Sequence, residues 1–178
     1  MRYAFSIIAV FFLFFTACRQ EKPVQIDTAA RTKVALRSFS DTATVDTFKI
    51  VLSGERPKEM ELVFTITSPS GQRIYTKILK ATSLLDNYKD NVDLGKEKKQ
   101  VKFMQDELGL FLDEENFLEP AVTDDELPDK NTPDKIFFAE LKKSGLNGFK
   151  YRLGKESNVY IAWSPSAGKV KPYYECCK

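Results

Sequence analysis

Alternation of apolar and polar residues is the clearest pattern in the first half of the chain. Four segments carry it: residues 33–39, 45–52, 60–67 and 73–80. In the third segment Leu62, Phe64 and Ile66 fall on one side, which is typical of a strand with one buried face. The run Ser68-Pro69-Ser70-Gly71-Gln72 between the last two segments predicts a hairpin turn. We therefore expect four strands in an antiparallel sheet with one buried face.

Helical signals replace this alternation in the middle of the chain. Thr82 or Ser83 can cap a short helix that continues to Tyr88. Four apolar residues then recur at intervals of three or four: Val101, Met104, Leu108 and Leu112. This spacing is typical of one face of a helix, but Gly109 interrupts it. A pair of short helices and an irregular crossing are therefore equally compatible with the sequence.

The last third of the chain combines a loop, a helix and strands. Residues 124–133 are rich in acidic residues and proline, which predicts an exposed loop. Thr132 before Pro133 predicts a helix start and Ser144-Gly145 a stop, so residues 134–143 are expected to be helical. Three strand candidates complete the chain: residues 149–153, 158–164 and 169–175. Together the elements predict an α+β fold of mostly antiparallel, sandwich-like sheet with one to three short helices.

An apolar run near the start of the chain stands apart from these elements. It covers residues 3–15, follows Arg2 and is followed by Thr16-Ala17-Cys18. A basic start, a short apolar stretch and small residues before the cleavage point are typical of a secretory signal. The run is shorter than the roughly 20 apolar residues of a transmembrane helix. An uncleaved signal anchor is the alternative interpretation.

A cysteine directly after such a cleavage point resembles the signal of bacterial lipoproteins, with Phe15 where that family usually has Leu. The resemblance implies that residues 1–17 are a signal peptide that is removed, and that Cys18 is lipidated. Two or more acyl chains hold a protein stably on a membrane without a spanning helix. Residues 18–31 are then the lipidated N-terminus and a flexible linker. Residues 32–178 are expected to form a single β-rich globular domain.

Other features are similar to those of small lipoproteins common in Bacteroidetes. They are the turn at residues 68–71, the strand at residues 159–163 and the terminal Cys176-Cys177. In lipoproteins, residues after the lipid cysteine direct sorting, and Arg19 is not the Asp that retains enterobacterial lipoproteins at the inner membrane. The resemblance therefore implies attachment to the outer membrane, facing the periplasm. It implies no particular activity or ligand.

The charge balance gives no indication of a nucleic-acid partner. The 178 residues include 27 basic and 25 acidic side chains, for a formal net charge of +2. Domains that bind nucleic acid usually carry a basic excess. We therefore expect no nucleic acid among the partners, which leaves the membrane itself, an envelope protein or a glycan.

The chain contains no histidine. This excludes Ser-His-Asp and Cys-His nucleophile activation, imidazole acid–base catalysis and zinc sites with histidine ligands. If Cys18 carries lipid, Cys176 and Cys177 are the remaining thiols. They can act as two small apolar residues that close a last strand, or form a vicinal or intermolecular disulfide in an oxidising compartment. Because no third ligand is visible, a metal or redox role is not expected.

Carboxylates and aromatic residues supply the remaining candidate chemistry. Residues 113–115 and 124–129 are rich in the oxygen ligands that hard cations prefer, but their spacing lacks the glycine and closing Glu of an EF-hand loop. Helix ends and a solvated loop explain them, so we predict no metal, no cofactor and no catalytic residue. Tyr160 and Tyr173 are the candidates for a ligand or partner surface, with half-buried sheet packing as the alternative.

The sequence therefore favours a binding or accessory protein over an enzyme. We expect a lipid-anchored cell-envelope protein that acts as a binding or accessory module in the periplasm. One alternative is a carboxylate-dependent hydrolase of envelope glycans, and the other is a structural or assembly partner of an outer-membrane complex. Two acids in a deep cleft would favour the hydrolase, whereas a closed sheet without a concavity would exclude it.

Overall fold

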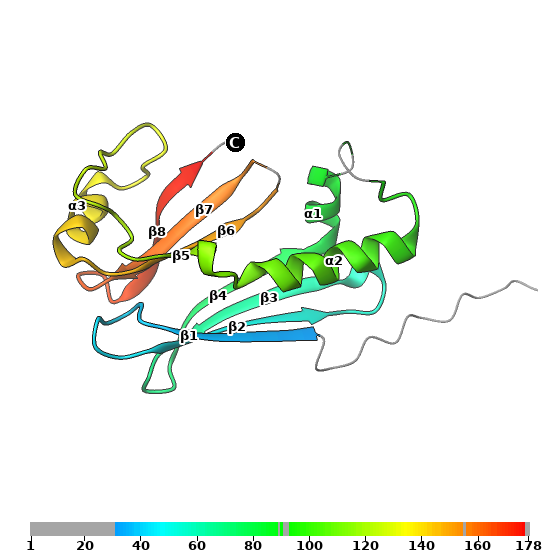
Figure 1. Ribbon diagram of the computed structural model, residues 1–178, viewed down its shortest axis with the longest axis horizontal. Helices are drawn as coiled ribbons and strands as arrows, with labels where there is room; N and C mark the ends of the chain where they lie inside the picture. Colours follow the sequence, from blue (N-terminus) through cyan, green and yellow to red (C-terminus); the bar gives the residue numbers. More distant parts are fainter. Residues whose placement is uncertain (1–30, 89, 91–92, 155, 177–178) are drawn as a thin grey trace, which may run out of the picture.

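Two four-stranded antiparallel sheets form the framework of the protein (Figure 1). The computed structural model describes residues 31–88, 90, 93–154 and 156–176. The first sheet has the order β1 (Thr32–Arg37), β2 (Asp46–Ser53), β3 (Glu61–Thr67) and β4 (Arg73–Lys80). The second has the order β5 (Phe117–Leu118), β6 (Gly148–Arg152), β7 (Asn158–Ser164) and β8 (Lys169–Cys176). The predicted α+β fold of mostly antiparallel sheet is confirmed, and only the two-residue strand β5 was not foreseen.

Three α-helices and two short 3-10 turns connect the strands. They are η2 (Pro57–Glu59), α1 (Ala81–Tyr88), α2 (Glu97–Phe111), η3 (Glu114–Asn116) and α3 (Lys135–Ser144). Helix α1 begins directly after β4, without the cap predicted at Thr82 or Ser83. Asp134 caps the start of helix α3, where its side chain accepts a hydrogen bond from the Phe137 N–H at 2.9 Å. It ends at Gly145, where a φ of 62° gives the left-handed conformation that favours glycine.

Helix α2 is one continuous helix of 15 residues. The structure therefore contains neither the pair of short helices nor the irregular crossing that Gly109 suggested. The buried side chains of the helix lie on one stripe: Val101, Met104, Leu108 and Phe111. Gly109 lies outside this stripe, and a side chain there would meet no neighbour within 4 Å. Packing of the apolar stripe outweighs the weak helix propensity of this single glycine.

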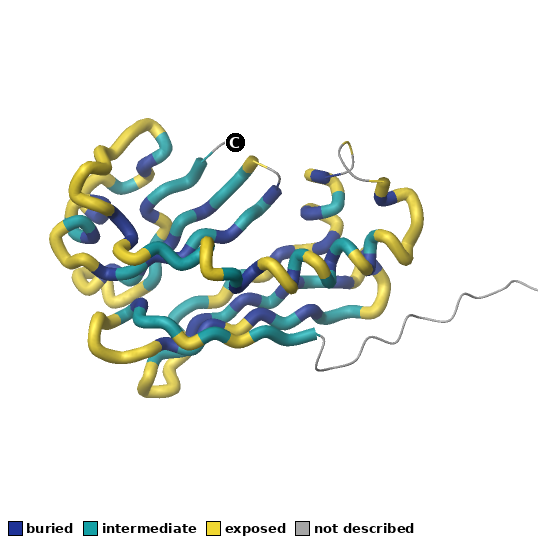
Figure 2. Tube along the Cα trace, in the orientation of Figure 1, coloured by how far each residue is buried: buried dark blue, intermediate teal, exposed yellow. Residues whose placement is uncertain are grey.

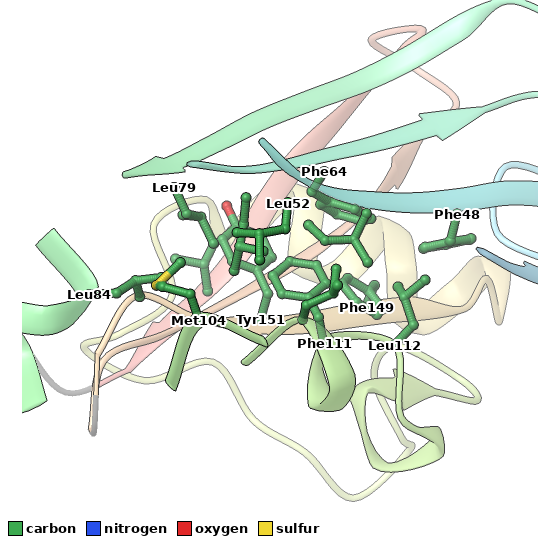
Figure 3. Packing of buried hydrophobic residues seen from close by; sticks show 14 of the residues in the cluster. Phe48, Leu52, Phe64, Leu79, Leu84, Met104, Phe111, Leu112, Phe149 and Tyr151 are labelled. Carbon is green, nitrogen blue, oxygen red and sulfur yellow. The ribbon is translucent and has the colours of Figure 1, made fainter. Parts of the chain in front are cut away.

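The main core lies on the inner face of the first sheet. Phe48, Phe64 and other alternate residues of β2 and β3 point into it, as the pleat of a strand requires. At one end of the sheet they pack against the second sheet, where the Phe48 and Phe64 rings lie 5.2 and 5.1 Å from that of Phe149. At the other end Leu79 packs with Leu84 and Met104 of the helices (Figure 3). One face of the first sheet thus supports both the helices and the second sheet.

A smaller core lies on the opposite face of the second sheet. Helix α3 contributes Phe137, Phe138 and Leu141, which pack with Ala162 and Tyr173 of the strands. Sheet β5–β8 is therefore buried between the first sheet and α3. The order of layers is the first sheet, then α2 beside the second sheet, then α3.

The outer face of the first sheet is not covered by any helix of the described chain (Figures 1 and 2). Val34 and Leu36 of the edge strand β1 are 56% and 54% exposed on this face. Two inward side chains of the same strand, Lys33 and Arg37, are charged. Lys33 donates a hydrogen bond to the Gly109 carbonyl and lies 3.2 Å from an Asp113 carboxylate oxygen. The positive charge of Lys33 interacts favourably with the C-terminal end of α2, where the helix dipole is negative.

A buried carboxylate organises the loop between β1 and β2. Asp46 is fully buried, and its carboxylate accepts hydrogen bonds from the backbone N–H groups of Phe39 and Ser40 at 3.2 and 2.9 Å. The Ser40 hydroxyl donates a third bond at 2.7 Å. A buried carboxylate needs such partners because it has lost its water. The hydrogen bonds in turn hold the Phe39 ring, 5.3 Å from Phe48, in the core.

Candidate binding pocket

A pocket of about 100 Å³ lies where α1, α2, the first sheet and β6 meet. We call it the wedge pocket. Its floor is apolar and consists of the buried side chains of Leu62, Leu79, Leu84 and Phe111. Figure 3 shows Leu79, Leu84 and Phe111 on the inner side of the first sheet, below Phe64. Each of these residues lies on the buried face of its own helix or strand. The packing of these elements therefore fixes the position of the floor.

The rim of the wedge pocket is charged and carries both signs. Glu107 and Glu115 come from the α2–η3 segment, and Lys150 and Arg152 come from β6. Arg152 donates a hydrogen bond to Glu107 at 2.9 Å, and its guanidinium lies 6.0 Å from the centre of the Tyr88 ring. The Glu107 side chain is only 12% exposed. This ion pair therefore joins α2 to the second sheet across one side of the pocket.

Burial raises the pKa of Glu107 above its ordinary value of 4.5, although the neighbouring Arg152 charge acts in the opposite direction. Desolvation is the larger effect because the carboxylate has few other hydrogen-bond donors. The folded protein consequently holds a proton on Glu107 at a pH at which the unfolded chain has released it. Stability supplied by this site is present at low pH and is lost as the pH rises through the folded-state pKa.

We therefore expect the free energy of unfolding of Glu107→Gln to depend less on pH than that of the wild type. As the pH rises from about 4 through the folded-state pKa of Glu107, the wild type should lose stability relative to the variant, because only the wild type must ionise a buried carboxyl group. Urea unfolding at several pH values measures the difference. The exposed Glu55→Gln, which does not line the pocket, is the matched control and should run parallel to the wild type. A variant curve parallel to the wild type would contradict the assignment.

Helix α1 also contacts the turn after β6, which joins two of the elements that contribute residues to the wedge pocket. The Asn87 side chain donates a hydrogen bond to the Leu153 carbonyl at 2.7 Å. Gly154 is buried against Asn87, and a Cβ at Gly154 would lie 2.9 Å from the amide nitrogen of Asn87. A larger residue at Gly154 would therefore displace the Asn87 side chain from this contact. The turn and helix α1 are held together on the same side as the Arg152–Glu107 pair.

Two of the charged rim residues have no partner within the described part of the chain. The Lys150 and Glu115 side chains make no hydrogen bond and no ion pair with a described residue. Lys150 is half-buried and Glu115 is exposed. The Arg152–Glu107 pair is mutually satisfied, so one cation and one anion at the rim remain available to a ligand.

A pair of tyrosines lies beside the floor. The Tyr75 and Tyr151 hydroxyl oxygens are 2.8 Å apart, and Tyr151 lines the pocket. Burial raises the pKa of both phenols above the ordinary value of 10.0. They are therefore protonated at neutral pH and act as hydrogen-bonding groups of the sheet interface, not as bases.

The structure does not bring the two predicted tyrosines together as a surface. Tyr173 is 3% exposed, and its hydroxyl donates a hydrogen bond to the Ala121 carbonyl at 2.8 Å. It belongs to the core beside α3, because β8 turns this position towards the helix. Tyr160 is half-buried, with its ring 6.1 Å from Tyr173 and 5.2 Å from Tyr174. The alternative of sheet packing describes both residues better than a ligand surface.

Glu126 of the second acidic segment and Cys176 have structural partners. Glu126 accepts hydrogen bonds from the Thr123 N–H and hydroxyl at 2.6 and 3.0 Å. Within the described residues, no three acidic or cysteine side chains are grouped so that they could hold a metal ion. Cys176 takes part in a disulfide. Cys18 and Cys177 lie outside the described residues, so their lipidation and pairing stay predictions.

Comparisons with known proteins add no further assignment. No protein-family model, no curated protein and no solved structure matches the chain. Across the described ranges, none of the helices is both long and apolar enough to cross a membrane. The candidate site therefore rests on its own geometry: an apolar floor, a satisfied ion pair and two unpaired charges.

Proposed function

We propose that this chain is a lipid-anchored envelope protein that binds a small solute in the wedge pocket. The pocket is the observation that supports binding, because an apolar floor with a few polar groups around it is the usual form of a ligand site. The apolar run that ends at Cys18 supports the anchor. We place the protein at the outer membrane with its domain facing the periplasm. Arg19 stands at the position where an Asp would retain a lipoprotein at the inner membrane.

Glycan hydrolysis is not the function that the pocket supports. Glu107 and Glu115 both line it, so two acids do share one concavity. However, the volume of about 100 Å³ is well below the several hundred Å³ of ordinary ligand pockets, and a sugar ring with an attacking water needs more room. Glu107 is also engaged by Arg152. Binding of a molecule smaller than a sugar fits this geometry better.

A second function, assembly with another envelope protein, is favoured by the outer face of the first sheet. Cross-strand neighbours on this face include Val51, Val63 and Ile78, and Val34 and Leu36 lie beside them. Exposed apolar side chains that adjoin one another over several strands are typical of an interaction surface. We rank this function second because the same face also carries charged residues, with Lys49 opposite Val34 and Glu61 opposite Lys80.

The anchor is tested by replacing its attachment point. Cys18→Ala in the full-length chain should abolish incorporation of radiolabelled palmitate, because the thioether and the free amine at this residue carry the acyl chains. The protein should then move from the membrane fraction to the soluble fraction or accumulate as an uncleaved precursor. Palmitate labelling and fractionation of the producing bacterium measure both effects.

Cys177→Ala is the matched control for this experiment. It removes a cysteine that we expect to lie outside the lipidation site, so labelling should match the wild type. Wild-type protein that incorporates no palmitate, or Cys18→Ala protein that is labelled equally, would contradict the anchor. Binding in the wedge pocket would remain open to its own test, because the pocket does not include Cys18.

A further inference from the structure

The volume of the wedge pocket limits the part of a ligand that can be enclosed in it. A dry apolar cavity of about 150 Å³ holds benzene, which has six carbon atoms. The wedge pocket, at about 100 Å³, therefore has room for about four carbon atoms. This is the size of a leucine or isoleucine side chain. The floor of Leu62, Leu79, Leu84 and Phe111 offers such a group apolar contacts on several sides.

The lip of the pocket extends the apolar floor towards solvent. Leu110 lines the pocket and is 49% exposed, although it belongs to a helix whose other large apolar residues are mostly buried. A ligand that covers this leucine removes apolar surface from water, which favours binding. The pocket thus provides apolar surface both at its base and at its entrance.

The charges at the rim set the chemistry of the occupant. Glu107 and Arg152 neutralise each other at 2.9 Å, which leaves Lys150 and Glu115 as one unpaired cation and one unpaired anion on the same pocket. A simple carboxylate would satisfy Lys150 and leave Glu115 facing a like charge. A simple amine would satisfy Glu115 and leave the lysine unpaired. A ligand with both charges next to an aliphatic group satisfies the two unpaired charges and the apolar floor.

We propose that the wedge pocket binds a free branched-chain aliphatic α-amino acid. Its side chain lies on the leucine floor, its carboxylate faces Lys150 and its ammonium group faces Glu115. This inference rests on the proposed function, since it names the ligand class of the same pocket. An α-amino acid carries both charges on one carbon, whereas the ends of a peptide lie too far apart for a pocket of this size.

Calorimetric titration of the detergent-solubilised full-length protein with L-leucine tests the proposal. Three compounds divide the ligand into its parts: 4-methylpentanoate lacks the ammonium group, 3-methylbutylamine lacks the carboxylate and glycine lacks the side chain. Each should bind about tenfold more weakly than L-leucine, since the loss of one charge pair or of one buried aliphatic group costs about that factor or more.

Variants assign the binding to the wedge pocket. Lys150→Met and Glu115→Gln should each weaken L-leucine binding about tenfold, and Leu110→Ala should weaken L-leucine but not glycine. These residues are partly or largely exposed, so the variants should fold. Lys143→Met and Glu55→Gln are matched controls, because both residues are exposed and neither lines the pocket. The controls should bind L-leucine as the wild type does.

Three results would overturn the inference. Absence of saturable binding of L-leucine would refute it outright. Equal binding of 4-methylpentanoate and L-leucine would refute the role of Glu115, while the proposed solute-binding function would survive with a carboxylate as its ligand. Binding that neither Lys150→Met nor Glu115→Gln changes would place the amino acid elsewhere on the protein. Failure of the anchor appears separately, in the palmitate labelling of Cys18→Ala.

Discussion

Phe149→Ala is expected to lower the free energy of unfolding by about 3–5 kcal/mol. Phe149 is fully buried and lies where the two sheets meet. Its ring centre lies 5.2 Å from that of Phe48, 5.1 Å from Phe64, 5.9 Å from Phe111 and 5.0 Å from Phe117. These four rings come from β2, β3, α2 and β5. The cavity left by alanine would therefore remove contacts from every layer of the main core at once.

Urea unfolding measures this loss through the shift of the midpoint at an unchanged slope. Phe149→Leu should cost clearly less, because leucine refills most of the space. Val45→Ala is the surface control, since Val45 is 51% exposed, and should change stability by less than about 0.5 kcal/mol. A loss for Phe149→Ala no larger than that of the surface control would show that this ring does not join the sheets.

Asp46→Ala is expected to lower the free energy of unfolding by about 3 kcal/mol. The cause is the loss of hydrogen bonds to polar groups and not the creation of a cavity. The substitution removes an acceptor that receives three hydrogen bonds, from the N–H groups of Phe39 and Ser40 and from the Ser40 hydroxyl. The Phe39 N–H is buried and cannot turn to bulk water, so it would be left without a partner. Thermal or urea unfolding measures the loss.

Two other aspartate variants separate this effect from a general change in the loop. Asp46→Asn keeps one carbonyl acceptor and should cost roughly half as much. Asp41→Ala lies in the same loop, where its exposed carboxylate accepts one bond from the Ala43 N–H at 2.6 Å, and should cost less than about 1 kcal/mol. If Asp46→Ala cost no more than Asp41→Ala, the buried carboxylate would not be the organiser of this loop.

The strands were predictable because their signal is local. Alternation in residues 60–67 predicts a strand of a sheet with one buried face. The structure has β3 at Glu61–Thr67. The interruption predicted at Gly109 was wrong, because the low helix propensity of glycine does not depend on which face of the helix the residue occupies. Its position outside the buried stripe of α2 decides the outcome, and that stripe forms only against the first sheet. The two-residue strand β5 is too short to leave a pattern.

The wedge pocket could not be predicted because its walls are far apart in the sequence. Glu107 and Arg152 are 45 residues apart, and each by itself reads as an ordinary charged surface residue. The floor residues Leu62 and Leu84 have the same pattern as any core leucine. Tyr173 failed as a surface candidate for a related reason: alternation identifies two faces of β8, but it does not reveal that α3 covers one of them.

The charged inward side of β1 has a consequence for a chain confined to a membrane plane. Tethered at Cys18, as we propose, many copies would share a two-dimensional layer, and the crowding there would favour encounters between their exposed sheet edges. Lys33 and Arg37 reach inward from that edge to the α2–η3 segment. Inward-pointing charges on an edge strand oppose pairing with another strand. The charges on β1 thus oppose the formation of sheets shared between neighbouring copies.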